Sequence, residues 1–227
     1  MKLKQPEAVI FDWDDTLVDT WQVIRNAMDV MLVAMGVKPW TEEEARRNIG
    51  PSARDLFTAL FGVDKWQEAD AVYLKAYKDG IRDYLRLHDG AKETLEFCKE
   101  RGIPLFVVSA KRGPLLRHEA EMLGLDKYFT KIVGAGDAVK DKPDVAAVNL
   151  VLEGSGIRPS ADVWFVGDSK TDMLAAHNSG CLPMLVNVRK LDLSTLADCP
   201  PVKELKSLTE LAGLMPESPA QKAKKIS

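Results

Sequence analysis

Five short apolar runs along the 227-residue chain constrain its fold more than any other feature of the sequence. They occupy residues 8–11, 105–108, 131–134, 163–166 and 184–188 and are rich in β-branched and aromatic side chains. They lack the polar–apolar alternation of a strand with one face in water, which is typical of parallel strands buried on both sides. Segments with helical apolar spacing lie between them. The pattern predicts an α/β core, a doubly wound (Rossmann-like) parallel sheet with helices on both faces.

The interval between the first two runs is far longer than a single crossover requires. About ninety residues lie there, although a dozen or more suffice to connect two parallel strands. Helix-start signals recur within it, at Trp21, at Thr41 with Glu44, at Pro51 and at Asp64. We therefore expect an all-helical cap domain over residues 19–87, inserted after the first strand of an α/β core domain that covers residues 1–18 and 88–215. Residues 216–227 are rich in Pro, Ser and Lys and predict a flexible tail.

Charge and cysteine content exclude several classes of partner. The 31 Lys and Arg residues nearly balance the 34 Asp and Glu residues, so the chain has no basic field that would attract nucleic acid or an anionic membrane. No apolar run approaches the roughly 20 residues needed to cross a bilayer. The three cysteines lack metal-binding spacing and predict reduced thiols in a cytoplasmic protein. The oligomeric state stays open.

Polar residues follow the predicted strands at the edge where ligands bind in open α/β sheets. They are Asp12, Asp14, Asp15 and Thr16 after the first run, Ser109 after the second, Lys142 before the fourth, and Asp168 and Asp172 after it. Carboxylates that converge on one rim repel one another unless a cation lies among them. Ligands that are all oxygen atoms favour Mg²⁺, and Lys142 adds a second positive charge for an anionic group. The rim therefore predicts a magnesium site that binds a phosphorylated substrate.

Asp12 and Asp14 are two residues apart, so their side chains point to the same side of an extended segment. One carboxylate can attack phosphorus while the other transfers protons. This arrangement predicts a covalent aspartyl phosphate.

These motifs, in this order, resemble the four motifs of the haloacid dehalogenase superfamily. The helical insert resembles the mobile cap of the subgroup that holds phosphoglycolate phosphatases and β-phosphoglucomutases. The resemblance implies that Asp12 is the nucleophile and a Mg²⁺ ligand. It implies that Asp14 is the acid/base, with a backbone carbonyl that also binds the metal, and that the turn over residues 16–19 is the hinge of the cap.

The same resemblance assigns the remaining site residues. Ser109 and Lys142 would hold phosphoryl oxygens, together with the backbone amide of Ala110, which stands where the family more often has Asn. Asp168 would ligate Mg²⁺, and Asp172 would bind it directly or through a water. Lys140 competes with Lys142 for the phosphate role, although the pairing with Pro143 favours Lys142.

Two further positions are less typical. Asp15 stands where the family usually has Gly, so the turn after the first strand could be altered. Arg54 belongs to a loop between two cap helices that reaches the substrate in the resembling subgroup, and it could clamp a second anionic group. The structural alternative is a helix that stops at Gly50 and a next helix with Pro51 in its first turn, which explains Gly50 and Pro51 and leaves Arg54 free. We assign no site role to Trp13 or to His88.

Several functions remain open within this resemblance. Asp14 argues against dehalogenation, because that reaction has no leaving-group oxygen to protonate. The favoured function is Mg²⁺-dependent hydrolysis of small phosphate monoesters, similar to phosphoglycolate phosphatase, with a small phosphorylated metabolite as substrate. A β-phosphoglucomutase-like phosphomutase is the alternative within the same chemistry, and a catalytically silent binding protein on the same fold is the alternative outside it.

Overall fold

A single parallel sheet organises the computed structural model, which describes residues 3–188 and 190–216, without the side chains of residues 82–84. The described residues contain six strands: β1 (Ala8–Phe11), β2 (Leu105–Arg112), β3 (Lys131–Ala135), β4 (Val163–Gly167), β5 (Leu182–Val186) and β6 (Lys203–Leu205). Their order is β3-β2-β1-β4-β5-β6, with every neighbouring pair parallel. The chain thus leaves central β1 toward one edge and later returns to its other side at β4. This is the switch point at which such sheets bind ligands, and the predicted fold class is confirmed.

Three features of the sheet differ from the sequence-based prediction. Strand β5 covers Leu182–Val186, two residues earlier than the predicted run at residues 184–188. The edge strand β6 was not predicted, because only one of its three residues is buried and no apolar run marks it. Strand β2 continues to Arg112, four residues beyond the predicted end at Val108. A register shift between Val108 and Arg112 accompanies this extension, and Arg112 pairs with Ala135 of β3. Such bulges redirect side chains near active sites.

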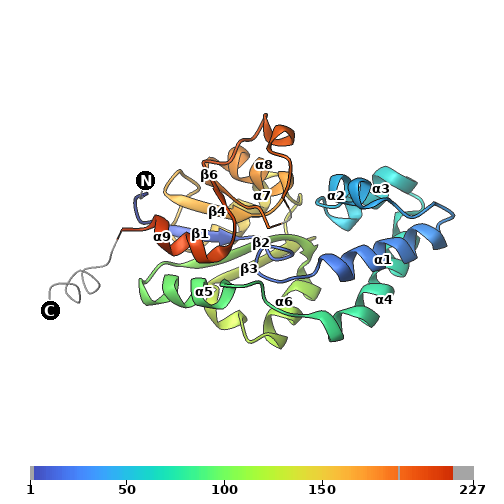
Figure 1. The fold of residues 1–227 in the computed structure, drawn as a ribbon, viewed down its shortest axis with the longest axis horizontal. Coiled ribbons are helices and arrows are strands. Elements are labelled where there is room, and N and C mark those ends of the chain that lie inside the picture. Colours follow the sequence, from blue (N-terminus) through green and yellow to red (C-terminus); the bar gives the residue numbers. More distant parts are fainter. Residues whose placement is uncertain (1–2, 189, 217–227) are drawn as a thin grey trace.

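Helices cover both faces of the sheet (Figure 1). The helices α5 (Ala91–Glu100), α6 (Gly113–Met122) and α9 (Leu211–Leu214) pack their buried residues into one apolar cluster with the strands. The helices α7 (Val145–Leu152) and α8 (Lys170–Ser179) form a second cluster on the opposite face. Short 3-10 helices cover residues Asp126–Tyr128, Leu193–Leu196 and Leu208–Glu210. Strands buried on both faces explain the continuous apolar runs in the sequence.

Four helices form the insert after β1: α1 (Trp21–Ala34), α2 (Glu42–Asn48), α3 (Ala53–Phe61) and α4 (Trp66–Tyr84). Figure 1 shows them to one side of the sheet. The predicted capping box of Thr41 and Glu44 is present at the start of α2. The helices α3 and α4 each begin two residues after the predicted starts at Pro51 and Asp64; Ser52 caps α3. We call α1–α4 the cap, and its boundaries at residues 19 and 87 stay a prediction.

Two chain segments connect the cap to the core, and they run side by side. The Asp19 amide donates to the carbonyl of Arg86 (2.9 Å), and the His88 amide donates to that of Leu17 (3.0 Å). The side chains of Arg86 and Asp19 also form an ion pair at 2.9 Å. The predicted hinge at residues 16–19 is therefore one of two hydrogen-bonded connections.

Outside the sheet, a few sequence-based expectations can be placed. No described helix is long and apolar enough to cross a membrane. The three cysteines are buried and free. The predicted tail lies outside the described residues except for Pro216, whose carbonyl accepts a hydrogen bond from Arg101 at 2.7 Å.

Candidate active site

A cavity of about 100 Å³ lies between the ends of the strands and the cap. The wall supplied by the sheet, here called the core wall, contains Asp12, Asp14, Ser109, Lys111, Lys142 and Asp168. The opposite wall, here called the cap wall, contains Ile24, Met28, Ile49, Leu56, Phe57 and Leu74. The structure thus brings most of the predicted site residues to one space, Ala110 among them.

Asp12 and Asp172 share one ammonium group, that of Lys142. The Lys142 Nζ atom lies 2.6 Å from Asp12 Oδ1 and 2.5 Å from Asp172 Oδ1. All three side chains are buried. Burial raises the pKa of Asp12 to about 7, and the nearby Lys142 charge offsets only part of this rise. The two carboxylates raise the pKa of Lys142 although burial alone would lower it, so this lysine stays charged.

Asp12, Asp168 and Asp172 form a group with the composition of a divalent-cation site. One oxygen of each carboxylate lies within 4.8 Å of those of the other two, and all three residues are buried. Hard oxygen donors at such separations suit Mg²⁺, which keeps part of its water shell and uses few carboxylates. The residues present therefore fit the metal that the sequence predicts.

Asp172 is held in place by the start of helix α8. Its Oδ2 atom accepts hydrogen bonds from the Ser169 amide (3.0 Å) and hydroxyl (2.6 Å), and its own amide donates to Ser169 Oγ (3.3 Å). This reciprocal pair is a capping box. A Cβ atom at Gly167 would lie 2.3 Å from Asp172 Cγ. Glycine at this position therefore lets the carboxylate approach the end of β4.

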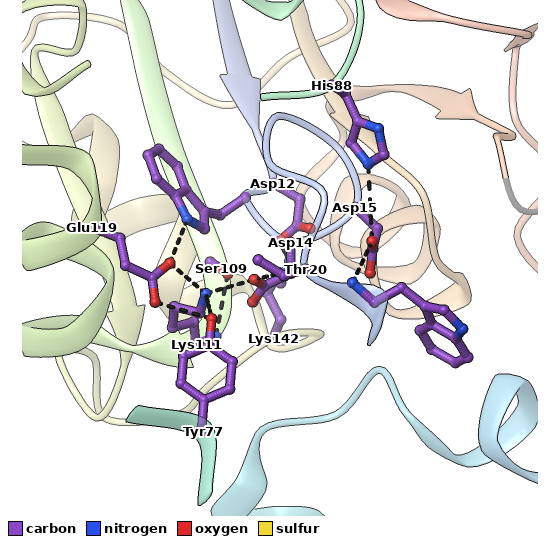
Figure 2. Close-up of polar contacts among 12 residues, drawn as sticks. Asp12, Asp14, Asp15, Thr20, Tyr77, His88, Ser109, Lys111, Glu119 and Lys142 are labelled. Atoms are coloured by element: carbon purple, nitrogen blue, oxygen red, sulfur yellow. Dashed lines mark hydrogen bonds and ion pairs between the residues drawn. The ribbon is translucent and has the colours of Figure 1, made fainter. Parts of the chain in front are cut away.

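Asp14 contacts a lysine that the sequence analysis did not assign to the site (Figure 2). The Lys111 Nζ atom lies 2.6 Å from Asp14 Oδ1, which also accepts a hydrogen bond from the Thr20 hydroxyl at 2.7 Å. Burial lowers the pKa of Lys111, but Asp14 and Glu119 outweigh it and raise the value to about 12. Lys111 therefore carries a permanent positive charge beside the predicted acid/base.

Glu119 of helix α6 completes a buried network around Lys111 (Figure 2). Its carboxylate lies 2.6 Å from Lys111 Nζ and accepts from the Trp13 indole (3.0 Å) and the Tyr77 hydroxyl (3.0 Å). Lys111 also donates to that hydroxyl at 2.8 Å. Tyr77 belongs to cap helix α4, so the network joins cap and core. The sequence gives only a weak signal for the role of Glu119, which is its place next to Ala120 on the buried side of α6.

Asp15 adopts a backbone conformation that favours glycine, with φ at 56°. This explains why the resembling family usually has Gly here, and Asp is among the residues that tolerate it. The Asp15 carboxylate accepts a hydrogen bond from the Trp21 amide at 3.0 Å, which ties the turn to the start of α1. Its side chain faces His88 of the second connection at 3.9 Å (Figure 2).

Arg54 and Lys140 are not among the residues that line the cavity. Arg54 pairs with Asp141 at 2.9 Å and lines a neighbouring groove between cap and core. Lys140 is exposed and lies 3.4 Å from Asp144. Of the two lysines considered for the phosphate role, Lys142 is the one that reaches Asp12. The substrate role of Arg54 stays a prediction.

Comparison with known proteins identifies the family to which the chain belongs. Residues 9–186 match the family described as haloacid dehalogenase-like hydrolase. A protein named phosphoglycolate phosphatase from Chromobacterium violaceum is 30% identical over 224 residues, which cover 95% of this chain and 99% of that one.

Solved structures show the same fold. A structure of a predicted phosphoglycolate phosphatase from Haemophilus somnus superposes with a TM-score of 0.79 at 22% identity, covering 92% of this chain and 98% of that one. A structure of a HAD-superfamily hydrolase from Ehrlichia chaffeensis superposes with a TM-score of 0.63 at 32% identity, covering 93% of this chain and 97% of that one.

Proposed function

Since the chain belongs to the haloacid dehalogenase-like hydrolases, we propose that it is a Mg²⁺-dependent phosphatase of small phosphate monoesters that uses an aspartyl-phosphate intermediate. The observation that carries this proposal is the buried group of Asp12, Asp168 and Asp172, with Lys142 paired to the first and the last of them and Asp14 lining the same cavity. Relatives named phosphoglycolate phosphatase support the reaction class.

The residues divide the work of holding the phosphoryl group. Asp12, the backbone carbonyl of Asp14, Asp168 and, directly or through a water, Asp172 would hold Mg²⁺, which neutralises charge on the phosphoryl oxygens when bound. Lys142 donates to Asp12 and Asp172 and keeps one N–H for a phosphoryl oxygen. The Ser109 hydroxyl and the Ala110 amide supply further donors beside it.

The reaction proceeds in two displacements at phosphorus. An oxygen of Asp12 bonds to phosphorus while the bond from phosphorus to the ester oxygen breaks, and Asp14 gives its proton to the departing alcohol. A water then attacks the same phosphorus, Asp14 accepts its proton, and the bond to Asp12 breaks to release inorganic phosphate. Asp14 can serve both steps because it lies next to the nucleophile in an extended segment.

Phosphate release separates hydrolysis from its alternatives. We expect release from a panel of small monoesters with Mg²⁺ and none with EDTA. A phosphomutase would instead move the phosphoryl group within a sugar phosphate, without free phosphate, when primed with the bisphosphate. A silent binding protein would do neither, and either result would overturn the proposal.

Three free, buried cysteines also support a cytoplasmic location, which is part of the proposal.

A further inference from the structure

The cap wall of the cavity is apolar. Its helices and the loop before α3 contribute aliphatic and aromatic side chains, and Phe57 and Tyr73 pack edge to face with ring centres 5.5 Å apart. The Tyr73 hydroxyl makes no hydrogen bond within the described part of the chain, and burial raises its pKa, so it stays neutral. The group that leaves with the ester oxygen therefore meets hydrocarbon and the uncharged hydroxyls of Tyr73 and Tyr77, the second of which is already bonded to Glu119 and Lys111.

All three N–H donors of Lys111 are directed to other groups of the protein. An ammonium group has three N–H donors. Those of Lys111 are directed to Asp14 (2.6 Å), Tyr77 (2.8 Å) and Glu119 (2.6 Å). With two carboxylates in contact and a side chain only 4% exposed, this lysine offers neither a free donor nor a net charge to a substrate anion.

The charges of the other cations in the cavity are also balanced by carboxylates of the protein. Among the described lining residues they are Arg112 and Lys142. Arg112 pairs with the buried Asp70 of cap helix α4, and Lys142 is directed to the phosphoryl end by Asp12 and Asp172. Each of the three lining cations thus pairs with at least one carboxylate of the protein, and none is left with an unbalanced charge for a second anionic group on the substrate.

Basic side chains without a partner among the described residues lie outside this cavity. Lys78 and His118 are exposed and line the neighbouring groove of about 600 Å³ that also contains Arg54. Ala53, Leu74 and Leu115 line both spaces and so stand between them, together with Arg112, whose charge is paired with Asp70. A small substrate held at Asp12 is therefore separated from Lys78 by these shared residues, most of which are apolar.

We infer that this enzyme prefers phosphate monoesters whose alcohol part is small, apolar and uncharged, rather than esters with a second anionic group. The inference rests on the proposed function and deepens it. It separates this chain from the relatives named phosphoglycolate phosphatase, whose named substrate carries a carboxylate beside the phosphate. The apolar cap wall supplies the affinity, and burial of an unpaired carboxylate there is costly.

Two esters of the same shape test the inference directly. 2-Phosphoglycolate and isobutyl phosphate differ in that a carboxylate replaces an isopropyl group. With Mg²⁺ we expect kcat/KM for isobutyl phosphate to be at least about tenfold higher. Equal or faster hydrolysis of phosphoglycolate would overturn the inference and leave the phosphatase standing. No phosphate release from either ester would overturn both.

A matched pair of variants on helix α3 tests whether the cap wall makes the selection. Leu56 lines the cavity, whereas Leu60 on the same helix is 41% exposed and lies away from it. We expect Leu56→Ala to lower kcat/KM for isobutyl phosphate about tenfold and to leave methyl phosphate within about twofold. Leu60→Ala should change neither. An equal loss on both esters in Leu56→Ala would contradict a role in recognising the alcohol part.

Discussion

The core wall and the cap wall of the cavity differ in how their residues are held as well as in charge. On the core wall, the charged groups lie at the edge of the sheet, and buried ion pairs hold several of them, as Lys142 is held by Asp12 and Asp172. On the cap wall, helices present aliphatic and aromatic side chains that pack among themselves. The difference separates two tasks: the core wall reacts with the phosphoryl group, and the cap wall selects the alcohol attached to it.

Among the changes to the core wall, removal of the nucleophile should lower the rate of phosphate release most. Asp12→Asn keeps the shape of the side chain but cannot form the acyl phosphate, so we expect phosphate release to fall at least about 10⁴-fold. Asp64→Asn, on an exposed residue of the cap, serves as the control and should retain full activity. The account of the core wall is wrong if Asp12→Asn keeps more than a few per cent of the rate in the presence of Mg²⁺.

Loss of the shared ammonium should have the next largest effect. Lys142→Ala removes the cation that contacts Asp12 and Asp172, and we expect kcat to fall about 10²- to 10³-fold. Lys140→Ala removes an exposed lysine that pairs with Asp144 and should stay within about twofold. Steady-state kinetics on one ester compares the two, and the reverse ranking would exchange their roles.

The buried network that joins the two walls should matter mainly for stability. Glu119→Ala leaves the Trp13 indole without its acceptor and reduces the carboxylates around Lys111 from two to one. We expect the free energy of unfolding to fall by about 3 kcal/mol. Glu121→Ala, an exposed position on the same helix, should cost less than about 0.5 kcal/mol. Urea unfolding measures both, and equal values would show that the network contributes little.

The pH dependence of metal binding should show the smallest effect. Burial raises the pKa of Asp12 to about 7, so below that pH a proton competes with Mg²⁺ for the carboxylate. Raising the pH removes the proton and strengthens binding; for one titrating group we expect about a tenfold gain in affinity from pH 6 to pH 8. Calorimetric titration of the metal-free protein measures it, with Asp12→Asn as a flat reference. An affinity that does not rise with pH would contradict the burial argument.

The core wall could be predicted from the sequence more fully than the cap wall. Asp12 and Ser109 follow an apolar run directly and Asp168 follows one after Gly167, and parallel strands bring such positions to one edge of the sheet. Position in the chain therefore predicts position in space. No comparable rule applies to the cap wall, because which side chains of α1, α3 and α4 face the cavity depends on how the cap docks on the core.

The network around Lys111 shows the same limit from within the core. Lys111 lies only two residues after Ser109, but its partners Glu119 and Tyr77 come from helix α6 and from the cap. Their contact with Lys111 depends on the extension of β2 beyond Val108 and on the register shift there. The pattern of apolar runs predicts neither the extension nor the register shift, so the position of Lys111 in the site could not be predicted from the sequence.

The most direct test of the aspartyl phosphate uses a variant that should trap it. With p-nitrophenyl phosphate, whose leaving group needs little protonation, Asp14→Asn can still form the intermediate but lacks the base for its hydrolysis. We predict a burst of one nitrophenol per chain and, after acid quench and peptide mass analysis, one phosphoryl group on Asp12. A variant that shows no burst and no phosphorylated peptide, or carries the phosphoryl group on another residue, would contradict the central claim.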